Sequence, residues 1–356
     1  MTRIVLAGAG TSGHVEPALA VAIWFQENLP EAELIFLGTT GGVENRLVPT
    51  AGFSLQLIDK VPFPRTINGA LFTWPLRFLK SLKQVRKIVK SSDLVIGFGG
   101  YVAAPAYLSA RFSGIPIVAH EANAKEGMAN KLAQLCGAIS LRAFGTPAPE
   151  RVGIPLRKNI VELAQLTSSE RVLAKHHALR ALRLDPQIPT ILVFGGSLGS
   201  MKFNGEIAKA KSALMDAGFQ IIHGVGAANE LPEASESYLP LHYIDDMAQA
   251  YAAADLVISR SGAVTVVEVG VLGVYSLFIP LPIGNGEQVD NARAVVAQGG
   301  GEILANSDFS SEWLQEHLTS LMDRARKWQE SGSRIDFPLN AAEQIGLRSL
   351  KELAHE

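Results

Sequence analysis

Two glycine-rich turns, each preceded by an apolar segment of strand length, lie far apart in this 356-residue chain. The first turn spans residues 8–14 after the strand-like residues 3–7, and the second spans residues 195–199 after residues 190–194. A strand that ends at glycines and continues into a helix exposes backbone N–H groups at the positive end of that helix, where an anion can bind. Two such units predict two similar α/β halves that hold a ligand.

Composition narrows the class of protein. A hydrophobic content of 47% with 19% charged residues is typical of a folded protein, and the net charge of −2 gives no reason to expect nucleic acid as a partner. Cys136 is the only cysteine, so no internal disulfide can form, and a reducing compartment is expected. The chain starts with a strand-like segment, so we expect no signal peptide, and residues 269–281 are too few to span a bilayer.

Strand-like and helix-like segments alternate along the chain, which predicts an α/β fold with parallel, doubly wound sheets. We expect strands over residues 3–7, 34–37, 94–98, 115–120, 138–144, 190–194, 220–225, 241–243, 256–259 and 276–281, and helices over residues 14–28 and 76–90 among others. The prolines and glycine of residues 148–160 predict a crossing between domains. We therefore expect a first domain over residues 1–156, a second over residues 157–340, and a closing helix within residues 341–356 that packs back on the first.

The first glycine turn fits the dinucleotide pattern G-x-G-x-x-G through Gly8, Gly10 and Gly13. A dinucleotide site also needs an acidic residue after the second strand, and that strand ends at Thr39 and Thr40 without one. A nicotinamide or flavin dehydrogenase is therefore disfavoured. A turn that only packs a helix against a sheet remains an alternative.

His14 follows the last of these glycines, at the start of the next helix. A helix N-terminus disfavours the imidazolium ion, so a neutral His14 could accept a proton as a general base. A ring that merely caps a loop carbonyl is the competing interpretation. Residues 97–101 and 120–123, including Glu121 and Asn123, also follow strands and are expected at the same ligand-binding edge of the sheet.

Residues 255–268 are the most specific segment of the second half. A strand is expected to end at Arg260, with a close turn at Ser261 and Gly262 and a helix from Ala263. The N-terminus of that helix could receive a diphosphate, and Glu268 could accept hydrogen bonds from ribose hydroxyls. Residues 286–288, placed in a loop after the next strand, offer further polar groups to a sugar.

Taken together, residues 11–17, 97–101, 120–123, 155–157, 195–197, 243–247 and 260–268 resemble the MurG family of bacterial glycosyltransferases over nearly the whole chain. The resemblance implies a GT-B fold, with two Rossmann-like domains and a cleft between them. It implies transfer of GlcNAc from UDP-GlcNAc to the MurNAc 4-hydroxyl of lipid I, undecaprenyl-pyrophosphoryl-MurNAc-pentapeptide, which forms lipid II for peptidoglycan. It also implies work at the cytoplasmic face of the membrane and contacts with cell-division proteins.

The family's residue roles carry over position by position. The resemblance assigns UDP-GlcNAc binding to Thr11, Ser12, Gly13, Asn123, Arg157, Gly196, Ser197, Ile244, Ala263, Val264, Glu268 and Gln288, and acceptor binding to Gly99, Gly100 and Tyr101. His14 is the first candidate base and Glu121 the second.

The transfer would invert the α-linked donor to a β-1,4 product, which needs proton removal from the hydroxyl and stabilisation of the departing diphosphate. We find no D-x-D motif at a strand end and no histidines with ligand spacing, so we expect no cofactor and no essential metal. Three alternatives stay open: a UDP-GlcNAc 2-epimerase, an NAD(P)H-dependent dehydrogenase, and an inactive UDP-sugar-binding protein.

Residues 67–80 combine bulky apolar side chains with a following cationic cluster, which is typical of docking on an anionic lipid surface. The expected membrane-contacting residues are Leu71, Phe72, Trp74, Phe78, Lys80 and Lys83. The alternative is that Leu71, Phe72, Leu76 and Leu79 form the buried face of an ordinary helix.

Overall fold

The computed structural model describes residues 1–61, 69–145, 150–282 and 286–354, and side chains are described except those of residues 69–73. The chain divides into two compact domains. The first domain comprises Met1–Arg157 with Pro338–Glu356, and the second comprises Lys158–Phe337. These bounds lie a few residues from the expected ones, and they place Arg157 in the first domain rather than the second.

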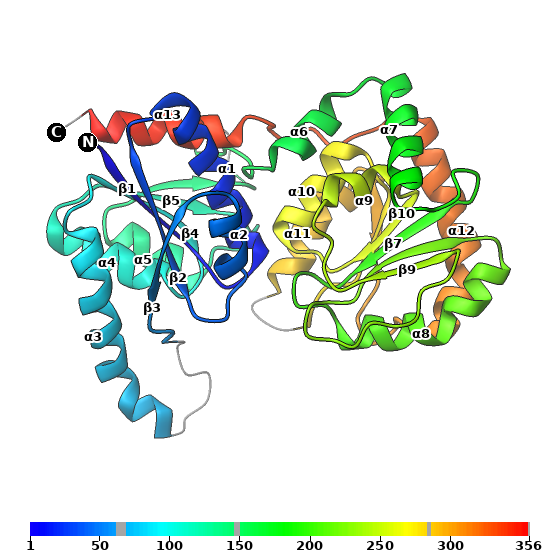
Figure 1. Cartoon of the computed structure of the whole chain (residues 1–356), viewed down its shortest axis with the longest axis horizontal. Helices are drawn as coiled ribbons and strands as arrows, with labels where there is room; N and C mark the ends of the chain where they lie inside the picture. Colours follow the sequence, from blue (N-terminus) through cyan, green and yellow to red (C-terminus); the bar gives the residue numbers. More distant parts are fainter. Residues whose placement is uncertain (62–68, 146–149, 283–285, 355–356) are drawn as a thin grey trace. The chain divides into compact units, whose positions relative to one another are not determined.

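The first domain is a parallel sheet with the strand order β3-β2-β1-β4-β5-β6 (Figure 1). Its elements are β1 (Arg3–Gly8), α1 (Ser12–Asn28), β2 (Glu33–Thr39), α2 (Glu44–Thr50), β3 (Ser54–Ile58), α3 (Gly69–Val89), β4 (Leu94–Gly99), α4 (Ala103–Ser113), β5 (Ile117–Glu121), α5 (Met128–Leu135), β6 (Ile139–Arg142) and α13 (Ala341–Leu353).

Helices cover both faces of this sheet, which explains why its central strands are apolar without alternation. Along β1, Ile4 and Leu6 pack in a core that includes residues of α1 and α13, whereas Val5 and Ala7 pack in a second core that includes residues of α3, α4 and α5. Ile345 of α13 belongs to the first of these cores. The closing helix expected from the sequence is therefore part of the first domain's core.

The second domain repeats the plan with the strand order β12-β11-β10-β7-β8-β9, again all parallel. Its elements are α6 (Lys158–Gln165), α7 (Ser168–Ala181), β7 (Thr190–Phe194), α8 (Met201–Asp216), β8 (Gln220–Gly224), β9 (Tyr238–Leu241), α9 (Met247–Ala253), β10 (Leu256–Ser259), α10 (Ala263–Leu272), β11 (Ser276–Phe278), α11 (Glu287–Val296), β12 (Gly301–Ile303) and α12 (Ser311–Glu330).

The doubly wound parallel fold expected from the sequence is confirmed, with three local corrections. β3 and β12 were not expected, and both are edge strands, the positions least in need of an apolar run. The strand expected over residues 241–243 is β9, which lies earlier, at Tyr238–Leu241. Glu287 and Gln288 begin α11 rather than lying in a loop.

Candidate active site

In the first domain, His14 lies in the first turn of α1, immediately beyond the carboxyl end of β1. Its side chain is partly exposed, and its Nδ1 lies 3.2 Å from the carbonyl oxygen of Ala9. A carbonyl oxygen can only accept a hydrogen bond, so this contact favours the tautomer with the proton on Nδ1, in which Nε2 keeps its lone pair. Burial lowers the pKa of His14 below its ordinary value, against the opposing effects of the Ala9 carbonyl, Glu121 and Glu44. The ring is therefore a neutral proton acceptor near neutral pH.

The loop after β4 makes room for this ring. Gly99 has a φ of +96°, and a Cβ at that position would stand 3.1 Å from both Cδ2 and Nε2 of His14. Gly100 has a φ of +81°, and a Cβ there would stand 2.3 Å from the Ala9 oxygen. Both residues therefore have a structural reason to be glycine, apart from the acceptor contacts expected of them. Tyr101 is 43% exposed beyond them, with the Lys60 ammonium 5.1 Å from its ring centre.

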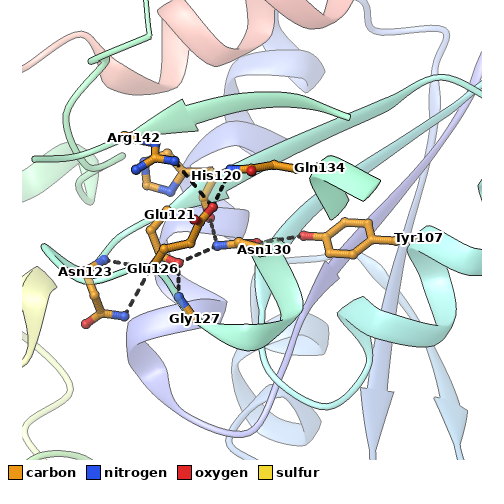
Figure 2. A network of polar contacts seen from close by, with 9 residues as sticks. All are labelled: Tyr107, His120, Glu121, Asn123, Glu126, Gly127, Asn130, Gln134 and Arg142. Atoms are coloured by element: carbon orange, nitrogen blue, oxygen red, sulfur yellow. Dashed lines mark hydrogen bonds and ion pairs between the residues drawn. The ribbon is translucent and has the colours of Figure 1, made fainter. Parts of the chain in front are cut away.

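Glu121, at the end of β5, is buried and uses both carboxylate oxygens (Figure 2). Oε1 accepts from the backbone N–H of Asn123 at 2.9 Å and from its side-chain amide at 3.2 Å. Oε2 accepts from the Gly127 N–H and the Asn130 amide, each at 2.8 Å. Glu121 thus holds the loop that carries Asn123.

Asn130 is a site residue that the sequence analysis missed. It is 4% exposed, and its amide also donates to the carbonyl of His120 at 3.2 Å while its Oδ1 accepts from the Tyr107 hydroxyl at 3.2 Å. Burial raises the pKa of Tyr107, so this hydroxyl stays protonated as the donor. The only sequence signal was a polar residue within the apolar face of α5. Figure 2 shows the chain of contacts from Tyr107 to Asn123.

The first glycine turn differs from expectation in one respect. Its backbone N–H groups were expected to be open to an anion, but the Gly10 N–H donates to Oε2 of Glu44 at 2.9 Å. Thr11, Ser12 and Gly13 follow at the start of α1, where Thr11 is the N-cap residue and makes no side-chain capping bond. Arg157, expected to contact the donor, pairs with Glu16 of α1 at 3.5 Å.

In the second domain, the segment 259–263 has the predicted form. β10 ends at Ser259, and α10 begins at Ala263 with Gly262 as its N-cap. The first turn of α10 carries no acidic residue, and the buried hydroxyl of Ser261 has no hydrogen-bond partner among the described residues. Val264 is partly exposed at this helix end. The arrangement leaves backbone and hydroxyl donors available to a diphosphate.

Arg260 fixes the loop before this helix by hydrogen bonds, a role that the sequence did not predict. Its guanidinium donates to the Ile279 carbonyl at 2.9 Å, to Asn306 Oδ1 at 2.7 Å and to the Ser200 hydroxyl at 3.2 Å. Ser200 is the N-cap residue of α8, whose side chain also accepts from the Phe203 N–H. Arg260 therefore links the loop before α10 to the second glycine turn, in which Gly196 is exposed and Ser197 partly so.

The remaining donor residues lie on neighbouring elements of the same domain. Glu268 is buried and accepts a hydrogen bond from the Tyr251 hydroxyl at 2.9 Å. Ile244 follows β9 and is 8% exposed. Gln288 lies in the first turn of α11. Its side-chain oxygen Oε1 accepts a hydrogen bond from the Leu281 N–H at 2.9 Å, so the side-chain carbonyl points toward the backbone of Leu281.

Two further properties of the described residues bear on the site. No three His, Cys, Asp or Glu side chains within residues 1–61, 69–145, 150–282 and 286–354 are grouped so as to hold a metal ion. None of the helices over these same ranges has the length and apolar character that crossing a membrane requires.

Two Rossmann-like parallel-sheet domains with glycine turns at the starts of helices define a GT-B glycosyltransferase, and comparisons with known proteins agree. Residues 4–135 match the glycosyltransferase family 28 N-terminal domain, and residues 190–345 match its C-terminal domain. The chain belongs to glycosyltransferase family 28 and, within it, to the MurG enzymes.

Named relatives support this assignment. A Corynebacterium diphtheriae protein is 48% identical over 318 residues, 87% of this chain and 85% of the relative. A Streptomyces coelicolor protein is 42% identical over 96% of each chain. Both are named UDP-N-acetylglucosamine–N-acetylmuramyl-(pentapeptide) pyrophosphoryl-undecaprenol N-acetylglucosamine transferase. The crystal structure of Acinetobacter baumannii MurG is 29% identical with a TM-score of 0.69, covering 99% of this chain and 100% of that one.

Proposed function

We propose that this chain transfers GlcNAc from UDP-GlcNAc to the 4-hydroxyl of MurNAc in lipid I, with inversion, to form lipid II for peptidoglycan synthesis. The observation that carries the proposal is the near full-length similarity to relatives named for this transfer. The geometry of each domain agrees with it, because one offers a proton acceptor and the other offers an open anion site with a nearby carboxylate.

UDP-GlcNAc is held mainly by the second domain in this proposal. The diphosphate lies at the N-terminus of α10, where Ser261, Ala263 and Val264 supply hydroxyl and backbone donors. The ribose hydroxyls donate to Glu268, which the Tyr251 hydroxyl orients. The Ile244 backbone contacts uracil, and Gln288, with its carbonyl bonded inward, directs its amide to the sugar.

His14 is the general base. Its Nδ1 is bonded to Ala9, so Nε2 takes the proton from the acceptor hydroxyl as that oxygen attacks the anomeric carbon. The bond from the anomeric carbon to the UDP oxygen breaks in the same displacement, and UDP leaves with the electron pair. Glu121 is a poor candidate for this proton because four donors already occupy its two oxygens.

The leaving diphosphate is stabilised by the helix end rather than by an essential metal ion. Backbone N–H groups and the helix dipole are already oriented at the N-terminus of α10, so they stabilise the developing charge without reorganising. The chemical step is therefore expected to proceed in EDTA.

Lipid I is reached by docking of α3 on an anionic membrane at its cytoplasmic face. Ser81, Val85 and Val89 form the buried side of this helix. Leu76 and Leu79 are 73% and 52% exposed, so the alternative that they form a buried helix face is wrong. The side chains of Leu71 and Phe72 lie outside the described residues.

Aromatic and cationic side chains lie on α3 together with these exposed leucines. Trp74 and Phe78 stack with ring centres 4.9 Å apart, and Lys83 and Lys87 are exposed further along the helix. Lys80 pairs with Asp59 at 2.7 Å, so its charge is partly balanced. Exposed leucines with neighbouring lysines are the combination that binds anionic lipid.

The test is an incubation with radiolabelled UDP-GlcNAc and a lipid I analogue, in buffer with and without EDTA. The expected product is the lipid-linked disaccharide in both, with none when the acceptor is omitted. UDP-ManNAc formed without acceptor would instead establish an epimerase. UDP-GlcNAc binding with no turnover of either kind would establish an inactive sugar-binding protein.

A further inference from the structure

The carboxylate of Glu44 is fully buried in the first domain. It is the first residue of α2 and is 0% exposed. Oε1 accepts from the Thr39 N–H at 2.9 Å and from the Thr39 hydroxyl at 3.3 Å, and Oε2 accepts from the Gly10 N–H at 2.9 Å. Burying a charged group is costly unless its hydrogen bonds are satisfied, so a carboxylate held this way needs an explanation.

The Gly10 contact leads directly to His14. The N–H of Gly10 and the C=O of Ala9 belong to one peptide group. Glu44 binds that group at its N–H, and His14 Nδ1 binds it at its C=O, at 3.2 Å. A carboxylate, a peptide group and an imidazole are thereby connected in series.

The space around this series is closed to larger residues. A Cβ on Gly42 would stand 2.1 Å from Oε2 of Glu44, and one on Gly100 would stand 2.3 Å from the Ala9 oxygen. There is thus no room for a further side chain beside either the carboxylate or the carbonyl of the peptide group.

We propose that Glu44 is a positioning residue that orients and activates His14 through the peptide group between Ala9 and Gly10. The inference rests on the proposed role of His14 as the base. A negative charge at the N–H end polarises the peptide and makes its carbonyl a stronger acceptor, since hydrogen bonds in a chain reinforce one another. The stronger acceptor keeps the proton on Nδ1 and leaves Nε2 for the sugar hydroxyl.

Electrostatics support the same role. The charged groups that act on the ring are Glu44 from α2 and Glu121 from the end of β5, and both raise the pKa of His14 against the lowering effect of burial. Removal of the Glu44 charge should therefore lower this pKa further. A weaker base follows, because basicity falls with pKa.

The test is Glu44→Gln, which preserves shape but removes the charge. A carboxamide has one acceptor oxygen, so its NH₂ group would face the N–H of either Gly10 or Thr39. We expect kcat to fall about 10- to 100-fold, the range typical of removing a group that orients a metal-binding histidine. The KM for UDP-GlcNAc should not change. The matched control is Glu33→Gln, which removes a partly exposed carboxylate of the same domain paired with Arg3.

A measurement independent of activity is ¹⁵N NMR of histidine-labelled protein, with the signal of His14 identified among the eight histidines by its loss in His14→Gln. The expected result is the Nδ1–H tautomer in the wild type and a lower titration midpoint in Glu44→Gln. The same midpoint and tautomer in both proteins would overturn the proposal.

Two further outcomes are decisive. Should Glu44→Gln not fold, the wild-type spectrum alone decides, because an Nε2–H tautomer at neutral pH contradicts the proposed series. Should the wild type transfer no sugar, the proposed function fails, while the NMR titration still tests the link between Glu44 and His14.

Discussion

At the scale of the residue, the start of α1 in the first domain and the start of α10 in the second differ in how their donors meet negative charge. In the first domain the Gly10 N–H is occupied by the carboxylate of Glu44. In the second domain the helix after Gly262 begins without an acidic residue, and the Ser261 hydroxyl beside it has no partner among the residues described. The donor before α1 is occupied by a carboxylate of the chain itself, whereas the described residues leave the start of α10 open to a diphosphate.

Replacement of His14 tests the base directly. His14→Ala should reduce kcat by about 10²- to 10⁴-fold, the usual contribution of a general base, with UDP-GlcNAc affinity unchanged. In the wild type, kcat/KM should rise with pH as the imidazole loses its proton, and level off at a lower pH than an unburied imidazole would give, because burial lowers the pKa of His14. Steady-state kinetics across pH measures both.

The control for this prediction is calorimetric titration of UDP-GlcNAc into the variant. Near-normal turnover of His14→Ala would remove His14 from the mechanism. A parallel loss of affinity and turnover would make it a binding residue.

The sequence predicted some of these residue roles and could not predict others. The helix start at Ala263 was predictable because its strand, glycine and helix are adjacent in the chain. The contact between Glu44 and Gly10 joins residues 34 positions apart, and that between Arg260 and Ser200 joins residues 60 apart. Neither has a local pattern, because folding alone brings the partners together.

At the scale of the element, the close packing of α1 against α13 depends on a glycine, Gly346, in α13. A Cβ on Gly346 would stand 2.1 Å from the ring of Trp24 in α1. Helices approach this closely only where one of them carries a very small residue. The same contact brings Ile345 into the core of the first domain.

Gly346→Ala should therefore destabilise the protein even though alanine favours helices. Overpacking of this kind costs about 1–3 kcal/mol, which corresponds to roughly 2–4 °C in Tm per kcal/mol for a domain of this size. Differential scanning calorimetry provides the measurement.

A matched change serves as the control. Gly205 lies within α8, and a Cβ there would meet nothing within 4 Å. Gly205→Ala should stabilise by about 0.5–1 kcal/mol, the helix preference of alanine over glycine. A stabilising effect of both substitutions would show that Gly346 is not needed for close packing.

The exposed side of α3 gives a second prediction at this scale. The double change Lys83→Glu and Lys87→Glu should weaken binding to anionic vesicles by at least 10-fold, because each cation near the surface contributes about 1 kcal/mol. Use of lipid I should fall in parallel. Sedimentation with vesicles provides the measurement.

UDP-GlcNAc affinity, measured on the same variant, is its internal control. A second control is Val172→Ser with Leu173→Ser, which removes exposed apolar side chains, 58% and 61% accessible, from α7. Equal sedimentation of wild type and lysine variant would exclude α3 as the docking surface.

The positions of buried strands were easier to predict from the sequence than those of exposed strands. The central strands β7 and β10 lie where the apolar runs predicted them, since both faces of each strand are covered. The edge strand β3 has mostly exposed or half-exposed residues, so it left no apolar run to detect.

At the scale of the whole molecule, one domain is inserted into the other. The chain leaves the first domain after Arg157 and returns to it at Pro338. The second domain is continuous and carries the residues proposed above to contact the uracil, the ribose and the diphosphate. A fragment of residues 158–337 should therefore fold alone and bind UDP with a Kd within about tenfold, or 1.4 kcal/mol, of the intact enzyme.

Titration calorimetry and circular dichroism of this fragment test the prediction. Its control is the same fragment with Glu268→Gln, in which the affinity should drop. A fragment that is unfolded, or folded without UDP affinity, would show that the donor site requires the first domain.

The insertion also sets the order in which the two domains receive their last residues. Synthesis runs from the N-terminus, and domains generally fold as units once their residues have emerged. The domain begun first waits for Ile345 of α13 to complete its core, whereas the inserted domain is complete at Phe337. The second domain is therefore the first to have all of its residues, and the domain that carries His14 stays incomplete, and accessible to chaperones and proteases, until α13 has been added.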